Sequence, residues 1–389
     1  AMVDGGYLAW RWYPGRRVFI DGRLEVHDES LYRDYLRLQR DPNVFEALAR
    51  RYDIAAVIWP HQQSAQAAGL LRYLAAGHGW SLVHVALASA VFARAPGKDS
   101  ALSGPLGQPL DPCDARVDRR LADQALNLHA RQRQGDPAPA WLRRLLPRRS
   151  MPTGAVNAGI FLGVMGCDAG AESLFRAALE DAPDDPDLLY DLGLVLARKG
   201  ETATAEQAYR KALRGHPSFA PAHEGLAQLA LAAGKDDLAL REWWRVERSG
   251  ELGLASLVAR GRLLLSRGRP EEAIADYGKA VLLAPERADL RIDLALACLR
   301  SGLKERAEIE LRSAAAIDPD DPHLFYGRAA LLLASGQIDA ALEALREGVR
   351  RGLDPHRLRD DPAFRMLSAR PDFDAILGAG AERAGKAVP

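Results

Sequence analysis

Asp21, Arg23 and His27 are the residues near the start of the chain whose types and spacing could do chemistry. They follow the apolar run Val-Phe-Ile, which is typical of a short buried strand, and α/β folds often bind ligands where a strand ends. A carboxylate, a guanidinium and an imidazole so close together could bind a sugar or a phosphate. We favour the structural alternative, in which Asp21-Gly22 makes a tight turn and an Asp21–Arg23 ion pair holds the loop.

The remaining histidines and cysteines form no motif for metal or redox chemistry. His223 has no second histidine one helical turn away, so no zinc site is expected. Cys113, Cys167 and Cys298 lie far apart, which we take to exclude a disulfide framework and a CxxC site and to leave the compartment open. GxGxxG, GxxxxGK[ST] and GxSxG motifs are missing from the sequence. We therefore expect no cofactor and no catalytic function.

Length and charge set further bounds. A chain of 389 residues is expected to form two or more domains. Its 52 basic and 52 acidic residues give a net charge of zero, which does not favour nucleic acid as a partner. No apolar run reaches about 18 residues, so no transmembrane segment is expected within the sequence.

From Pro152 onward the sequence repeats every 34 residues, and six units tile residues 152–355 without an insertion. Small residues recur at the eighth position, glycine at the fifteenth, alanine at the twentieth and mostly large side chains at the twenty-fourth. Glycine at the fifteenth position supplies the positive φ with which a helix ends, and small residues let two helices approach closely. Each unit is thus predicted to be a helical hairpin that must stack on its neighbours. The fifteenth-position glycines are Gly166, Gly200, Gly234, Gly268, Gly302 and Gly336.

This pattern resembles the tetratricopeptide repeat (TPR) family over all six units. The resemblance implies an α-helical superhelix with a concave groove that binds a peptide or helix of a partner protein, at positions two, five, nine, twelve and thirteen of each unit. The three arginines and the apolar character of this set favour an apolar partner segment that also bears acidic residues. The groove residues so identified are Tyr190, Leu194, Arg198, Glu224, Gln228, Val258, Arg262, Ile292, Leu296, Arg300 and Tyr326.

Two segments flank the repeats. Residues 97–151 are predicted to be a linker followed by two helices, over 115–134 and within 138–149, that cap the first repeat with Trp141 as an anchor. Residues 356–380 are predicted to be the C-terminal cap, because a repeat array needs a polar outer face at its end. Residues 381–389 are a tail.

Residues 5–96 have a different rhythm. Two single strands are predicted, with the sequences RRVFID and DIAAVIWP, and a hairpin is predicted from WSLVHVAL and AVFARA. Three helices are expected between these strands. One of them begins at Asp41-Pro42, and another ends at Gly77 or Gly79. The sequence thus predicts an α+β multidomain protein: a small N-terminal α/β domain with a mixed sheet, then a helical solenoid.

The blocks GGYLAWRWYPGRRVFIDGR, YDIAAVIW and GWSLVHVALASAVFAR resemble an extracytoplasmic C-terminal domain of bacterial polytopic glycosyltransferase-like membrane proteins. This resemblance implies a periplasmic or extracytoplasmic location, tethered to an upstream membrane portion, and a link to envelope glycan assembly. The abrupt start of the chain fits a removed membrane segment. The resemblance covers about ninety residues.

We therefore expect a non-catalytic interaction scaffold whose TPR groove binds a protein or peptide partner. One alternative is an enzyme or sugar-binding module centred on Asp21, Arg23 and His27. Another is a cytoplasmic TPR scaffold with an added α/β domain.

Overall fold

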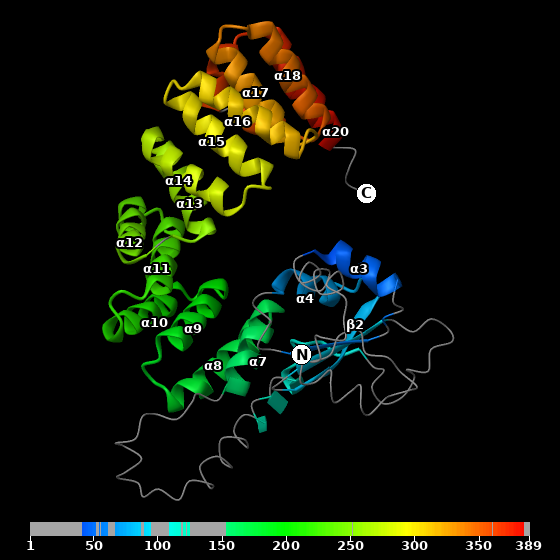
Figure 1. Cartoon of the computed structure of the whole chain (residues 1–389), viewed down its shortest axis with the longest axis vertical. Helices are drawn as coiled ribbons and strands as arrows, with labels where there is room; N and C mark the ends of the chain where they lie inside the picture. Colours follow the sequence, from blue (N-terminus) through cyan, green and yellow to red (C-terminus); the bar gives the residue numbers. More distant parts are fainter. Residues whose placement is uncertain are drawn as a thin grey trace, which may run out of the picture. The chain divides into compact units, whose positions relative to one another are not determined.

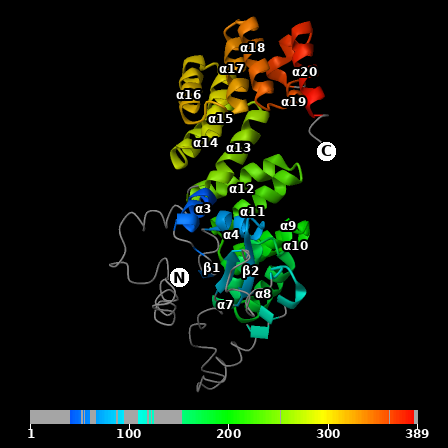
Figure 2. The same ribbon diagram turned by 90° about the vertical axis from the view of Figure 1, so that its right-hand side faces the viewer.

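The computed structural model describes residues 41–51, 54, 56–60, 67–86, 89–94, 109–117, 120–121, 123–124, 153–250, 252–359 and 361–384. The chain forms two compact units, Ala1–Leu229 (unit 1) and Ala230–Pro389 (unit 2). Figures 1 and 2 show the strands and helices of unit 1 in blue to green and the helices of unit 2 in green to red.

Unit 1 contains a three-stranded sheet made of β1 (Ala56–Pro60), β2 (Trp80–Val85) and β3 (Ser89–Arg94) in the order β1-β3-β2. Both pairings are antiparallel, with Val57 opposite Phe92 and a register shift between Leu82 and His84. The predicted hairpin is confirmed. The predicted mixed sheet is not: the described strands pair only antiparallel, and the expected strand at 16–21 lies outside the described residues.

Two helices pack on this sheet, α3 (Pro42–Arg51) and α4 (Ala68–Ala75). The side chain of Asp41 accepts a hydrogen bond from the backbone N–H of Asn43 at 2.9 Å, which helps to start α3 at Pro42. The indole Nε1 of Trp80 donates to Glu46 at 2.8 Å and joins α3 to β2. Gly77 and Gly79, with φ of 83° and 82°, follow α4 as the sequence predicts.

The repeats follow as helical hairpins, as predicted. The first helices are α7 (Thr153–Val164), α9 (Pro186–Arg198), α11 (Ala220–Ala232), α13 (Leu254–Ser266), α15 (Ala288–Arg300) and α17 (Pro322–Ala334). The second helices are α8 (Asp168–Asp181), α10 (Thr202–Gly215), α12 (Asp236–Ser249), α14 (Pro270–Leu283), α16 (Lys304–Ile317) and α18 (Ile338–Arg350). Every fifteenth-position glycine has a φ between 68° and 83°, which confirms its predicted place after the first helix.

The large side chain at the twenty-fourth position fills the space between neighbouring hairpins. Tyr209 on α10 is 1% exposed and lies against Gly193 of its own repeat and Gly225 of the next. A Cβ atom added to Gly225 would lie 2.6 Å from Cζ of Tyr209, closer than packed atoms approach. The small residues are therefore there because an aromatic ring occupies the space that a side chain would need.

The C-terminal segment folds into α19 (Pro355–Arg359), the 3₁₀ helix η3 (Pro362–Leu367) and α20 (Pro371–Ala384). Its Phe364, Phe373 and Ile376 are buried in one core with Leu342 and Leu345 of α18. This segment covers the apolar side of the last repeat, as a cap must.

The cysteine prediction was wrong. Cys113 and Cys167 form a disulfide, with their Cα atoms 4.8 Å apart, while Cys298 is a buried free thiol. The pairing is long-range, across 54 positions of sequence, so spacing along the chain did not indicate it. Two residues of the first predicted N-terminal capping helix, Val117 and Leu121, are buried in the core of unit 1. Trp141, the anchor expected in the second, lies outside the described residues.

Candidate partner-binding face of the repeats

The first helix of each repeat supplies the side chains of the candidate face. In unit 1, α9 begins at Pro186 because Asp185 precedes it and accepts a hydrogen bond from the backbone N–H of Leu188 at 3.0 Å. Residues three or four apart on a helix share one side. This spacing aligns a stripe of aromatic, apolar and charged side chains on α9: Asp187, Tyr190, Asp191, Leu194 and Arg198.

Aromatic packing fixes the centre of this stripe. The ring of Tyr190 lies 5.9 Å from that of Tyr209 and 6.3 Å from that of Phe219, measured between ring centroids. Tyr209 is buried, whereas Tyr190, Leu194 and Phe219 keep part of their surface in solvent. Burial, followed by the charges of nearby carboxylates, raises the pKa of Tyr190, so its hydroxyl stays protonated at neutral pH. The stripe therefore presents a fixed, partly exposed aromatic surface.

Two carboxylates flank Tyr190. Within the described part of the chain, no hydrogen bond or ion pair reaches Asp191. Burial, with smaller contributions from the charges of Asp187 and Asp185, raises the pKa of Asp191 to about 7. Burial and Asp185 also raise the pKa of Asp187, although His216 opposes this shift. The α9 stripe thus carries a carboxyl group, Asp191, that has no ion-pair partner among the described residues and is about half ionised near neutral pH.

Arg198, at the end of the stripe, was expected to attract an acidic partner. Its Nε donates to Oδ1 of Asp168 at 2.9 Å, and the two form an ion pair. On α11, Glu224 is half-buried and Gln228 is exposed. The charge of Arg198, one of the three arginines on which the expected acidic ligand depended, is therefore already balanced by a carboxylate of the preceding repeat.

In unit 2 the predicted residues divide into three groups. Val258 and Leu296 are half-buried and Arg300 is exposed. Arg262 is exposed and pairs with Asp293 at 3.3 Å. Ile292 is only 2% exposed, so it belongs to the core and does not line an open surface.

Tyr326 belongs to none of these groups, because the C-terminal segment engages it. Its hydroxyl donates to Oδ2 of Asp361 at 2.5 Å, and its ring lies 5.1 Å from that of Phe364 in an edge-to-face arrangement. The predicted contact residue of the sixth repeat is thus already in use within the chain.

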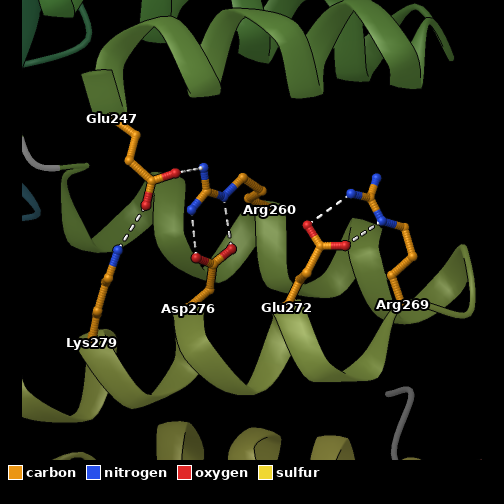
Figure 3. A network of polar contacts seen from close by, with 6 residues as sticks. All are labelled: Glu247, Arg260, Arg269, Glu272, Asp276 and Lys279. Atoms are coloured by element: carbon orange, nitrogen blue, oxygen red, sulfur yellow. Dashed lines mark hydrogen bonds and ion pairs between the residues drawn. The ribbon is translucent and has the colours of Figure 1, made fainter. Parts of the chain in front are cut away.

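Unit 2 also contains a buried polar network, drawn in Figure 3. Arg260 on α13, 4% exposed, donates to both oxygens of Asp276 on α14 at 2.7 and 2.6 Å and to Glu247 on α12 at 2.9 Å. Lys279 also donates to Glu247, at 2.7 Å. These hydrogen bonds, from Arg260 above all, lower the pKa of Glu247 to about 2. The network joins three consecutive helices and has the character of a structural element, because its central charges are enclosed and fully paired.

The alternative site of Asp21, Arg23 and His27 lies outside the described residues. Among the residues that the structure does describe, no three histidine, cysteine, aspartate or glutamate side chains gather in a way that could hold a metal ion. Within that same part of the chain, no helix has the length and apolar character needed to span a membrane.

Asp187, Asp191 and Phe219 are the members of the face that the sequence analysis missed. Asp187 lies at the second position of its repeat, one of the positions named from sequence, but it was not among the residues chosen. Asp191 occupies the sixth position, next to the fifth-position residue Tyr190 that was chosen. The available signal was the alignment of the two aspartates with Tyr190 and Leu194 at helical spacing.

Two ranges of the chain match models described as tetratricopeptide repeat: residues 264–331, and residues 169–249 through two overlapping matches at 169–220 and 202–249. These ranges lie within the hairpins described above, and they are TPR repeats.

One curated relative is cellulose synthase operon protein C of Xanthomonas axonopodis pv. citri (strain 306), which is 29% identical over 187 residues. The match covers 46% of this chain and only 12% of that protein.

Several solved structures also resemble the chain. YrrB, described as a TPR protein with an unusual peptide-binding site, has 20% identity over 46% of this chain and 93% of its own, with a TM-score of 0.43. PilF of Pseudomonas aeruginosa has 24% identity over 52% of this chain and 93% of its own, with a TM-score of 0.39. PilW, a type IV pilus biogenesis factor, has 18% identity over 52% of this chain and 94% of its own, with a TM-score of 0.41.

Proposed function

We propose that this protein is a non-catalytic interaction scaffold, and that the α9 stripe of unit 1 binds an extended segment or helix of a partner protein. TPR proteins bind protein or peptide partners, and the inner helices of such arrays are suited to this role. The observation that supports this stripe in particular is its composition. Tyr190 and Leu194 remain partly exposed beside Asp187 and Asp191, and Asp191 has no ion-pair partner in the described part of the chain.

The charge of the stripe favours a partner with basic side chains beside apolar ones. A lysine or arginine placed near Asp191 would give this half-buried carboxylate the ion pair that it lacks. This reverses the acidic partner expected from sequence, because two of the three arginines behind that expectation are already paired, Arg198 with Asp168 and Arg262 with Asp293.

The test uses the full chain and two fluorescent synthetic peptides of equal length, one alternating leucine with lysine and the other leucine with glutamate. In fluorescence anisotropy at low salt, we expect the lysine peptide to bind at least tenfold more tightly. The double change Asp187→Lys and Asp191→Lys should remove that preference. Glu206→Lys, at a partly exposed position of α10 where Glu206 pairs with Arg210, is the control for added positive charge away from the stripe and should retain it.

Equal affinity for the two peptides would contradict the basic-partner proposal. Binding of neither peptide would contradict the α9 stripe as a peptide-binding face. A loss of preference in the Glu206→Lys control as large as in the double variant would show that bulk charge, not the α9 stripe, determines binding.

The proposed setting is extracytoplasmic, tethered to a membrane protein and linked to envelope glycan assembly. The Cys113–Cys167 disulfide supports this setting, since disulfides persist in oxidising compartments and are rare in the cytosol. The distant relative named for a cellulose synthase operon agrees with a glycan-related role. Alkylation trapping in the native cell is the test: protected Cys113 and Cys167 are expected, and full alkylation of both would favour the cytoplasmic alternative.

A further inference from the structure

Helix α7, the first helix of the first repeat, differs from the other first helices because it contains no charged residue. Each of the other five contains at least one, such as Glu224 on α11 or Arg328 on α17. The Phe161 and Leu162 side chains of α7 are fully buried. A helix without charged side chains and with so few polar ones must be covered by other parts of the protein besides its own hairpin partner α8.

The α/β elements supply that cover. Leu70 and Leu74 of α4 and Phe92 of β3 belong to the same continuous core as Phe161 and Leu162. Arg72 on α4 also donates a hydrogen bond to the carbonyl oxygen of Val164 at 3.4 Å. Val164 is the last residue of α7, where carbonyl groups have no partner within the helix and a cation is favourable.

Residues 109–117, which we name the strap, join the sheet to the first repeat. At one end, the backbone N–H of Leu110 donates to the carbonyl of Leu82 on the edge strand β2 at 2.7 Å. In the middle, Cys113 is bonded to Cys167, the residue that immediately precedes α8. At the other end, Val117 is 8% exposed and packs in the shared core.

The two cysteines differ in access. Cys113 is exposed, whereas Cys167 is only 4% exposed. Because access decides where thiol–disulfide exchange begins, attack by a thiolate from solvent is expected at Cys113.

The geometry points to a redox-dependent clasp: the Cys113–Cys167 disulfide holds the strap, and with it the α/β cover, on α7, and a dithiol reductant opens it. A thiolate of the dithiol attacks Sγ of Cys113 and forms a mixed disulfide, while Cys167 leaves as a thiolate and takes up a proton. The second thiol of the dithiol then displaces Cys113. The dithiol ends as a disulfide, and the protein gains two electrons and two thiols. Once the strap is released, the apolar surface of α7 loses part of its cover.

The test is amide hydrogen exchange, read by mass spectrometry on the full chain with and without dithiothreitol, while free thiols are counted in parallel. Counted in denaturant, because Cys298 is buried, we expect one free thiol before reduction and three afterwards. Exchange in α7, β2 and the strap should rise at least tenfold on reduction, while α15 to α17 of unit 2 stay unchanged as an internal reference.

Variants separate the clasp from a general effect of the reductant. Cys113→Ser should exchange at the reduced rate with or without dithiothreitol. Cys298→Ala, which removes the third cysteine, should respond to dithiothreitol as the natural protein does.

Three results would each overturn the inference. They are three free thiols before reduction, a bond that dithiothreitol does not open, or reduction without faster exchange in α7. The dithiothreitol comparison on the natural chain decides the matter even where Cys113→Ser does not fold.

Discussion

The two units place a carboxylate at the same repeat position and treat its charge differently. Asp191 in unit 1 and Asp293 in unit 2 both occupy the sixth position, and burial raises the pKa of each. Asp293 meets Arg262, the ninth-position residue of the preceding repeat, and that charge opposes the rise. The corresponding ninth-position residue before Asp191 is Ile160, which cannot pair. In these two places, the ninth-position side chain of the preceding repeat thus decides whether the sixth-position carboxylate is paired within the chain or is left available to a partner.

The largest expected effect concerns the buried network of unit 2. Asp276→Leu leaves Arg260 without its main partner in a nearly closed site, so unit 2 should lose about 3–5 kcal/mol of stability. The matched control on the same helix is Glu272→Leu, which breaks only the partly exposed pair with Arg269 and should cost about 0–1 kcal/mol. Segment-resolved hydrogen exchange in α13 and α14 measures both, and equal losses would show that burial does not strengthen this network.

A smaller effect of opposite sign is expected from Asp191→Asn in unit 1. Because its folded-state pKa, about 7, lies above the unfolded value, ionisation of Asp191 destabilises the fold progressively as pH rises from about 4 to 7. The amide should therefore stabilise unit 1 by about 1–3 kcal/mol at pH 8 and by nothing near pH 3.5. The measurement is hydrogen exchange in α9 at pH 8, with the low-pH comparison made by denaturant titration.

Asp293→Asn is the control for that prediction, because it also discards a partner of Arg262. It should give no comparable gain at pH 8. If both amides stabilise equally, the contrast between the two units is incorrect.

The smallest effect is expected from Glu247→Gln. The pKa of Glu247 is lowered to about 2, so its contribution is complete above about pH 4.5 and is lost as pH falls toward 2. Its side chain is 36% exposed, so solvent screening should limit the loss to about 1 kcal/mol. Acid titration of unit 2 stability should show this loss in the natural chain and not in the variant, opposite in direction to the effect of Asp191 in unit 1.

The sequence predicted the repeats well because their signals are local. Each fifteenth-position glycine acts through its own φ, and the small and large residues act between adjacent helices. The disulfide was missed because it depends on the strap lying against β2, which no spacing reveals. The ion pairs were also missed, although a signal existed: Arg198 pairs across 30 positions and Arg262 across 31. Equivalent positions in neighbouring repeats are 34 residues apart. A separation of 30 or 31 therefore joins residues of neighbouring hairpins that are offset by about one helical turn from equivalent positions.

The hydrogen bond between Tyr326 and Asp361 limits how an array of this kind can lengthen during evolution. A new hairpin added after the sixth would separate Tyr326 from Asp361. It would also leave the apolar side of the last repeat without the C-terminal segment that covers it. Duplication of an internal hairpin, such as the one that begins at Leu254, would leave the contact between Tyr326 and Asp361 intact. The array can therefore gain repeats most easily by duplication of internal hairpins, because the contacts of its first and last repeats with the flanking segments are then kept.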